Sequence, residues 1–294
     1  MASVSAAGAA PALPLRSRLG TRGVYWLFTT PAVLLLAAFY FYPLLSVLWT
    51  SVTEPKPGLG NYALLATSPA IQHVLVTTAR ICALTTAVTI LLGYAVAYAL
   101  VHLSPRARRW MFLGVLLPLW ISVLARAFAW VTLLRTEGLV NQLLLELDLT
   151  REPLHLMWNE LGITIGMIHY MLPYAILPLY ANMRGIDLRL VAAARGLGAT
   201  RGQSFRHVFL PLSLPGIVGA GVLVFIFSLG FFVTPAILGG NRVLMIAQYI
   251  SIQILEVVRW GIGAMMATVL MAAVLALMAL LARIVDFRRL FGVG

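Results

Sequence analysis

Few side chains in this sequence have the types and spacings that chemistry requires. The five histidines are scattered without the short spacings of zinc ligands, and the single cysteine, Cys82, cannot form an internal disulfide. Lys56, the one lysine, stands between two prolines instead of within the Gly-Lys-Ser/Thr of a phosphate-binding loop. No Gly-x-Ser-x-Gly motif marks a nucleophile. The sequence therefore predicts no catalytic residue, no metal site and no cofactor, ATP included, bound by this chain.

Ionisable residues inside long apolar stretches are the next candidates, because a charge in hydrocarbon is costly and usually has a function or a partner. Arg80, Arg126 and His169 occupy such places. Arg80 lies near the end of its stretch, from which its side chain could instead extend to the membrane surface. His169 is close to Tyr170 and Tyr174 and either lines a cavity or is hydrogen-bonded to a neighbouring helix.

Aromatic side chains form a second class of candidate, because their faces attract cations. The alternative is that they pack between helices or lie at the membrane interface, as most aromatics in membrane proteins do. No Asp or Glu lies in the middle of an apolar stretch, so a basic solute and an anionic amine-containing solute both stay open. The residues predicted to line a solute pathway are Arg126, Trp130, His169, Tyr170, Tyr174, Phe231 and Phe232.

Membrane-spanning helices must position these residues. Hydrophobic residues make up 61% of the 294 residues and charged residues 10%. Several apolar stretches reach the roughly 20 residues that a helix needs to cross a bilayer. The predicted fold class is an all-α membrane protein, with a disordered tail over 1–23, a transmembrane domain over 24–294, and six spans at 24–50, 71–103, 110–134, 161–183, 211–238 and 262–285.

Positive charge is distributed unevenly among the connections between these spans. Alternate connections and the two termini together hold 14 of the 21 basic residues, whereas the opposite connections hold seven of the nine acidic residues. Because cytoplasmic loops are enriched in Arg and Lys, the basic side, with both termini, is predicted to be cytoplasmic. This topology, with contact to anionic lipid, accounts for the net charge of +12 without nucleic acid.

Residues 187–217 form the most polar long stretch of the chain. Asp187 is a good N-cap for a short helix over 188–197, and Gly198 can end that helix in a left-handed turn. Thr200 and Gln203 then have the spacing of a capping box, which predicts a second helix running to Pro211. The predicted result is two short helices joined at Gly198.

The first of these helices has a slim, partly apolar face. At helical spacing, one stripe contains Leu190, Ala193, Ala194 and Leu197. Such a helix can insert into a groove on a partner protein. It can equally lie on the membrane surface, where its arginines would contact lipid headgroups.

The segment resembles the EAA loop of ABC importer permeases, whose usual form is Asp-x-x-Leu-x-Glu-Ala-Ala-x-x-Leu-Gly-Ala followed by Phe and Leu-Pro. This resemblance implies a coupling loop over about 184–210 that docks on ATPase subunits. One departure is that Ala192 stands where the family has Glu, and Gly196 replaces a residue that is commonly acidic. The predicted coupling residues are Asp187, Leu190, Ala192, Ala193, Ala194, Leu197, Gly198, Ala199 and Phe205.

Other blocks are similar to the spermidine/putrescine-type permeases of this family. Arg126, Ala129 and Trp130 match an Arg-x-x-Ala-Trp segment, and Gly138 and Asn141 match the Gly-x-x-Asn that follows. The resemblance implies a type I fold in a bacterial inner membrane, with import of a polyamine or related amine by alternating access. The implied partners are two ATP-binding ATPase subunits, a second permease subunit, membrane lipid and an extracytoplasmic substrate-binding protein.

Two alternatives to this function are an ABC permease for a different solute class and a transporter driven by an ion gradient. The second normally has internal repeats and acidic residues in its spans to couple ion movement. Neither feature is found in this sequence. An intramembrane enzyme would need paired carboxylates, metal ligands or an activated nucleophile, and the sequence offers none of them.

Overall fold

The computed structural model describes residues 21–284, and every regular element among them is helical. The chain divides into two units between Trp49 and Thr50, which are described separately. Of the tail predicted over 1–23, residues 1–20 lie outside the described residues, while 21–23 belong to the first helix.

The described part of the first unit is one long apolar helix. α1 (Thr21–Leu36) continues through the π-helical turn η2 (Ala37–Phe41) into α2 (Tyr42–Thr53), whose last residues belong to the second unit. From Tyr25 to Thr53 this helix is long and apolar enough to cross a membrane. It confirms the first predicted span.

Three helices form the centre of the second unit: α4 (Pro69–His102), α8 (Glu160–Arg184) and α11 (Leu210–Leu229). Small residues let their backbones approach, as is usual between membrane helices. A Cβ atom at Gly93 would lie 3.1 Å from Ala175 Cβ, and one at Gly216 would lie 2.7 Å from Asn182 Cβ. These contacts fix α8 against both of its neighbours.

The third predicted span, 110–134, is wrong as a single helix. α5 (Pro105–Trp120) ends before Ile121 and Ser122, both of which have non-helical backbone, and α6 (Val123–Leu134) then begins a segment, Val123–Glu146, that is bent by 100° from α5. Pro118 in the last turn of α5 has no backbone N–H, so that turn lacks one of its hydrogen bonds. The described chain therefore has five helices long enough to span, or six if the bent pair is one span.

The fifth and sixth spans also differ from prediction in their first and last residues. The fifth span begins earlier and ends earlier than 211–238, because α10 (Arg201–Ser204), the π-helical turn η3 (Phe205–Phe209) and α11 form a continuous helix that ends at Leu229. The sixth span is α14 (Trp260–Ile284). Three short helices occupy connections where no helix was predicted: α3 (Gly60–Thr67), α7 (Leu139–Glu146) and α13 (Ile246–Leu255). A fourth, α12 (Val233–Gly239), occupies the end of the predicted fifth span as a separate helix.

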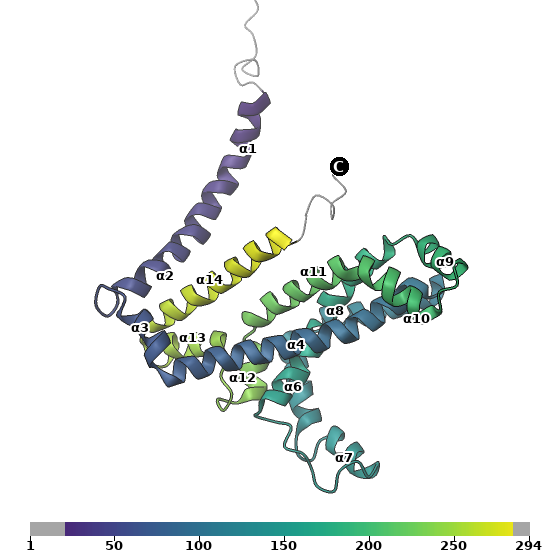
Figure 1. Cartoon of the computed structure of the whole chain (residues 1–294). Coiled ribbons are helices and arrows are strands. Elements are labelled where there is room, and N and C mark those ends of the chain that lie inside the picture. The colour runs from purple at the N-terminus through teal and green to yellow at the C-terminus, as the bar shows by residue number, and fades with distance from the viewer. Residues whose placement is uncertain (1–20, 285–294) are drawn as a thin grey trace, which may run out of the picture. The chain divides into compact units, whose positions relative to one another are not determined.

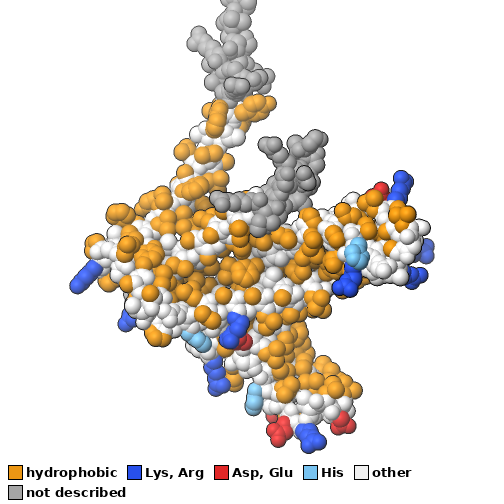
Figure 2. Space-filling model, viewed as in Figure 1, with side chains coloured by type: hydrophobic (Ala, Val, Ile, Leu, Met, Phe, Trp, Pro, Cys, Tyr) orange, Lys and Arg blue, Asp and Glu red, His pale blue; other side chains and the backbone are white. Residues whose placement is uncertain are grey.

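The connections separate by charge along the second unit. α9 (Leu188–Gly196) and α10 lie at one end of α4, whereas α3 and α13 lie at its other end (Figure 1). Basic side chains gather around the end formed by α9 and α10, and acidic side chains occur around α7 (Figure 2). Apolar side chains cover much of the surface of the helices between these regions.

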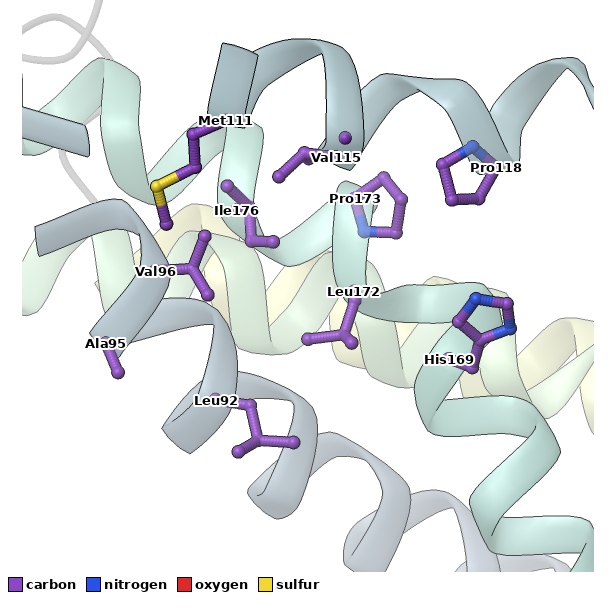
Figure 3. Close-up of a pocket in the computed structure, with 11 residues that line it drawn as sticks. Leu92, Ala95, Val96, Met111, Val115, Pro118, His169, Leu172, Pro173 and Ile176 are labelled. Atoms are coloured by element: carbon purple, nitrogen blue, oxygen red, sulfur yellow. The ribbon is translucent and has the colours of Figure 1, made fainter. Parts of the chain in front are cut away.

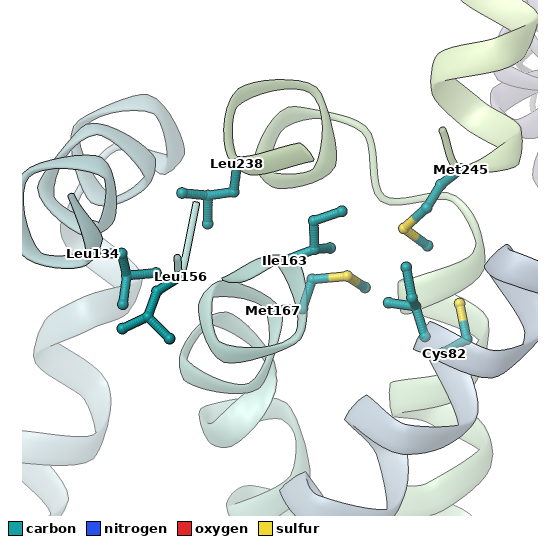
Figure 4. Close-up of a cluster of buried hydrophobic side chains, with 8 residues drawn as sticks. Cys82, Leu134, Leu156, Ile163, Met167, Leu238 and Met245 are labelled. Atoms are coloured by element: carbon teal, nitrogen blue, oxygen red, sulfur yellow. The ribbon is translucent and has the colours of Figure 1, made fainter. Parts of the chain in front are cut away.

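A buried cluster joins the shorter helices to the central three (Figure 4). Met167 of α8 lies among side chains from α4, α6 and α12, and it is fully buried. The other members of this cluster are Ile81, Cys82, Leu134, Leu156, Ile163, Leu238 and Met245. This packing holds α6 beside α8, and most of the predicted pathway residues lie on those two helices.

Candidate functional site

The 184–210 segment folds locally as the sequence predicts. The Asp187 carboxylate accepts a hydrogen bond of 2.9 Å from the Arg189 backbone N–H and caps α9. At the other end, the N–H of Gly198 donates to the Arg195 carbonyl at 3.0 Å, and the N–H of Ala199 donates to the Ala194 carbonyl at 3.1 Å. This pair of bonds is a Schellman motif, and the φ of +92° at Gly198 is the left-handed conformation it requires.

The second helix starts from the predicted capping box. The Gln203 side chain accepts from the Thr200 N–H at 2.8 Å, and the Thr200 hydroxyl accepts from the Gln203 N–H at 3.3 Å. The Schellman motif at the end of α9 and the capping box at the start of α10 therefore hold the two helices in fixed geometry on either side of Gly198. The prediction of two helices joined there is confirmed.

α9 presents different faces to the helix bundle and to solvent. Val191 and Ala194 are half-buried toward the bundle, and Val191 packs against a buried cluster that includes Met183 and Phe209. Of the predicted apolar stripe, Ala194 is therefore turned inward. The remaining three residues, Leu190, Ala193 and Leu197, are exposed, and Leu197 is 91% exposed.

A pocket of about 250 Å³ lies behind α9, between that helix, α10, η3 and the last turns of α4. Ala192 and Arg195 line it from α9, and Arg201 lines it from α10. Phe205, which was predicted as a coupling residue, forms part of its wall and stacks with Phe209 at a centroid distance of 6.0 Å. Of the predicted coupling residues, Leu190, Ala193 and Leu197 thus lie on an exposed face of α9, whereas Ala192 and Phe205 line the pocket behind it.

Three of the seven predicted pathway residues, Arg126, Tyr174 and Phe231, contact Tyr170 directly. Together with Trp130 and His169, which contact each other, we call Arg126, Trp130, His169, Tyr170, Tyr174 and Phe231 the aromatic cluster. The Arg126 guanidinium lies 4.3 Å from the centre of the Tyr170 ring. Tyr170 also stacks on Tyr174 at 5.8 Å and contacts Phe231 at 4.5 Å between ring centres. Residues from α6, α8 and the loop before α12 therefore meet at one place.

His169, which precedes Tyr170 in the chain, pairs with Trp130 of α6. The Trp130 indole N–H donates to His169 Nδ1 at 3.1 Å, which satisfies the histidine from a neighbouring helix. His169 also lines a largely apolar pocket of about 610 Å³ between α4, α5 and α8, together with Pro118 and Pro173 (Figure 3). His169 is thus both hydrogen-bonded to a neighbouring helix and exposed to a cavity, the two alternatives that the sequence left open.

Arg126 is the one charged side chain among the buried residues that the structure describes. It is 8% exposed, and its Nε and Nη1 atoms have no hydrogen-bond partner within residues 21–284. A buried charge without a carboxylate is costly, so the cation–π contact with Tyr170 offsets only part of the loss of water.

Two predicted positions lie outside the aromatic cluster. Phe232 is 42% exposed, and the loop that brings Phe231 inward directs it elsewhere. Arg80 forms an ion pair with Glu160 at the start of α8. An ion pair with a neighbouring helix is a structural role for Arg80, in keeping with its place near the end of a span.

Buried polar side chains that sequence reasoning missed lie on α4 and α11, and Asn141 of α7, named there only as a motif match, is buried as well. Thr85 and Thr89 of α4 and Ser228 of α11 are fully buried within the bundle. Asn141 is also fully buried: its side chain accepts from the Leu154 N–H at 2.8 Å and donates to the carbonyls of Arg135 and Leu154. The spacing of the threonines along one helical face was the available signal, and Asn141 already stood out in the Gly-x-x-Asn block.

No group of His, Cys, Asp or Glu side chains in residues 21–284 has the arrangement of a metal site. The two features that the structure does show are the pair of short helices α9 and α10 and the aromatic cluster between α6, α8 and the loop before α12. Residues 89–290 match the family described as "Binding-protein-dependent transport system inner membrane component".

The chain belongs to this family. It is a permease subunit of an ABC importer, a multi-pass inner-membrane protein, and ATP hydrolysis belongs to separate ATPase subunits. The permease is 31% identical over 237 residues to the spermidine/putrescine transport system permease protein PotB of Salmonella typhimurium, covering 78% of this chain and 82% of the relative. It is 34% identical over 190 residues to PotB of Haemophilus influenzae, covering 64% and 66% of the two chains.

The fold of this permease is also found in a bacterial alginate ABC transporter, crystallised in complex with an alginate pentasaccharide-bound periplasmic protein. The TM-score is 0.74, with 18% sequence identity, over 92% of this chain and 96% of the other. The identity is too low to transfer a substrate, but the likeness confirms the predicted permease fold.

Proposed function

We propose that this permease forms half of the pathway by which an ABC importer takes up a polyamine, or a related amine-containing compound. The observation that supports this most strongly is the 31% identity to spermidine/putrescine permeases over 82% of their length. The aromatic cluster offers a chemical basis, since the Tyr170 ring already holds the Arg126 guanidinium and the neighbouring rings of Tyr174 and Phe231 can hold a protonated amine in the same way.

The complex would contain two ATPase subunits, a second permease and an extracytoplasmic binding protein. In this arrangement the Arg-rich 184–210 segment and both termini face the cytoplasm, as the positive-inside rule favours. The exposed Leu190, Ala193 and Leu197 dock in a groove of the ATPase, in the manner of an apolar helix face. ATP binding favours one arrangement of the ATPase pair, and the docked α9 transmits that preference to α8 and α11.

A second candidate solute is an amine that also has a carboxylate. Arg126 favours it, because the buried guanidinium has two nitrogen atoms without a partner in the described chain and repels a purely cationic solute. A carboxylate that accepts from those nitrogens would convert an uncompensated charge into a charge-assisted hydrogen-bonded pair.

Putrescine and ornithine form a matched pair of probes, since they differ by one carboxylate. The complete importer, reconstituted in liposomes with its cognate binding protein, is tested for ATP-driven uptake of each, with wild type and Arg126→Gln. The polyamine proposal expects uptake of putrescine that Arg126→Gln preserves or increases. Uptake of ornithine alone, abolished by Arg126→Gln, would establish the second candidate and contradict the first.

A further inference from the structure

The pocket behind α9 lies at the level where two membrane spans end. The span of α4 ends at His102, the span that contains α11 begins at Arg201, and both residues line this pocket. The other residues that line it come from α9, α10 and η3, at the same end of α4 (Figure 1). Because the polar headgroups of a bilayer lie just outside its hydrocarbon region, a cavity at the ends of two spans lies at the depth of those headgroups.

Two arginines make this pocket basic. Arg195 lines it from α9 and Arg201 from α10, and no acidic side chain is among its lining residues. Neither arginine forms an ion pair within residues 21–284. The one acid of the 184–210 segment, Asp187, accepts the backbone N–H of Arg189 instead. The described chain therefore supplies no carboxylate to either guanidinium.

The rest of the lining combines a third polar group with aromatic rings. His102 Nδ1 donates to the Tyr98 carbonyl at 2.8 Å, so Nε2 is the nitrogen that this imidazole has left for a ligand, and it is a donor when the ring is protonated. The Tyr98 ring packs edge-on against Phe205 and Phe209, at 5.6 and 5.2 Å between ring centres. The pocket thus suits a ligand that joins an anionic group to an apolar part.

We propose that this pocket binds the headgroup of an anionic phospholipid, whose phosphate oxygens accept hydrogen bonds from Arg195, Arg201 and His102. The planar donors of arginine match phosphate oxygens through paired hydrogen bonds, and basic pockets between membrane helices bind lipid headgroups in this way. The cavity of about 250 Å³ is smaller than the roughly 300–1,000 Å³ of pockets that enclose drug-sized ligands. It therefore fits a headgroup, while the acyl chains stay in the bilayer.

The position of the pocket on α9 favours lipid over protein as the source of the anion. Ala192 and Arg195 line the pocket and, at 3.6 residues per turn, lie on one side of α9. The exposed Leu190, Ala193 and Leu197 lie on the opposite side. A protein that covers those three residues does not reach the pocket, whereas the bilayer adjoins the span ends that form it.

The test is native mass spectrometry of the purified permease complex, titrated with dioctanoyl phosphatidylglycerol. The Arg195→Gln/Arg201→Gln double variant should bind this lipid at least roughly tenfold more weakly than wild type, because both guanidinium donors are lost. The matched control is Arg189→Gln/Arg206→Gln, which removes two charges from the same segment outside the pocket. Because those charges are exposed and screened, its affinity should stay within about twofold of wild type.

A second pair of variants tests the cavity without changing its charge. Ala192→Phe fills the pocket and should weaken binding of the same lipid at least roughly fivefold, because the headgroup and the new ring compete for one space. Ala193→Phe adds the same side chain on the opposite side of α9. It should leave the affinity within about twofold of wild type.

Four results would overturn the proposal. Equal affinities of the two arginine double variants would show that the pocket is not the lipid site, and unchanged affinity of Ala192→Phe would show that the headgroup does not enter it. Equal binding of dioctanoyl phosphatidylcholine would show that net negative charge is not recognised. Displacement of the lipid by an equal concentration of glycerol 3-phosphate would assign the pocket to a free phosphate instead. The assay contains neither solute nor ATP, so its outcome does not depend on the function proposed above.

Discussion

Gly198→Ala tests how much the backbone conformation of the coupling segment, as distinct from its side-chain contacts, contributes to ATPase binding. Gly198 has a φ of +92°, and a Cβ atom added there would meet nothing within 4 Å. The substitution therefore creates no clash, and its cost comes from holding a residue with a side chain in the left-handed region, about 1–2 kcal/mol. Because the Schellman motif sets the angle between α9 and α10, this energy opposes the docked geometry.

The matched control is Gly196→Ala. Gly196 is also surrounded by open space, but it lies inside α9 with helical backbone, where Ala stabilises a helix by about 0.5–1 kcal/mol relative to Gly. We expect Gly198→Ala to weaken ATPase binding by roughly 5- to 30-fold, corresponding to the 1–2 kcal/mol above. Gly196→Ala should leave binding unchanged or slightly tighter.

The assay is surface-immobilised permease complex titrated with ATPase, with circular dichroism to establish that both variants keep their helical content. Gly198→Asn adds a third point, because Asn tolerates the left-handed region better than Ala does. The ATPase affinity of this variant should lie between those of Gly198→Ala and the wild type. Indistinguishable affinities for the two alanine variants would refute the reasoning, since they differ only in the backbone conformation at the substituted position.

Three further predictions concern the framework of the bundle. Gly216→Ala should lower the melting temperature of the purified protein and cost about 1–3 kcal/mol, because its Cβ would lie 2.7 Å from Asn182 Oδ1, whereas Gly219→Ala, in open space, should have little effect. Asn141→Ala should cost about 1–3 kcal/mol in the same thermal assay, because it removes the hydrogen bonds that the fully buried Asn141 side chain makes with Leu154 and Arg135. Arg80→Gln should change stability by less than about 1 kcal/mol and leave transport intact, because Arg80 is 59% exposed and its ion pair is screened by water.

Local features of the chain were predictable wherever a few neighbouring residues determine the backbone. Asp187 and the Thr200–Gln203 capping box satisfy N–H groups within one turn of their own helices, so their roles follow from spacing alone. The left-handed turn at Gly198 follows in the same way. The spans were predictable because the thickness and hydrophobicity of the membrane determine their length and apolar composition, whichever residues pack beside them.

Features that depend on contacts between distant segments were not predictable. In the sequence, α5 and α6 form one uninterrupted apolar run, because Ile121 and Ser122 resemble ordinary helix residues. Their non-helical conformation depends on where α6 packs. Phe231 and Phe232 are indistinguishable in sequence, yet the loop before α12 turns only the first toward Tyr170. The inward turn of Ala194 likewise follows from the position of α9 on the bundle.

The central claim is that this chain couples solute import to ATP hydrolysis on other subunits, and one measurement tests it most directly. The permease is co-purified with its second permease and ATPase subunits, reconstituted in liposomes, and assayed for ATP hydrolysis with and without the binding protein loaded with putrescine or spermidine. We predict that the loaded binding protein stimulates hydrolysis and that labelled polyamine accumulates in the liposomes. Failure of any ATPase to co-purify, together with accumulation driven by an ion gradient without ATP, would contradict the account.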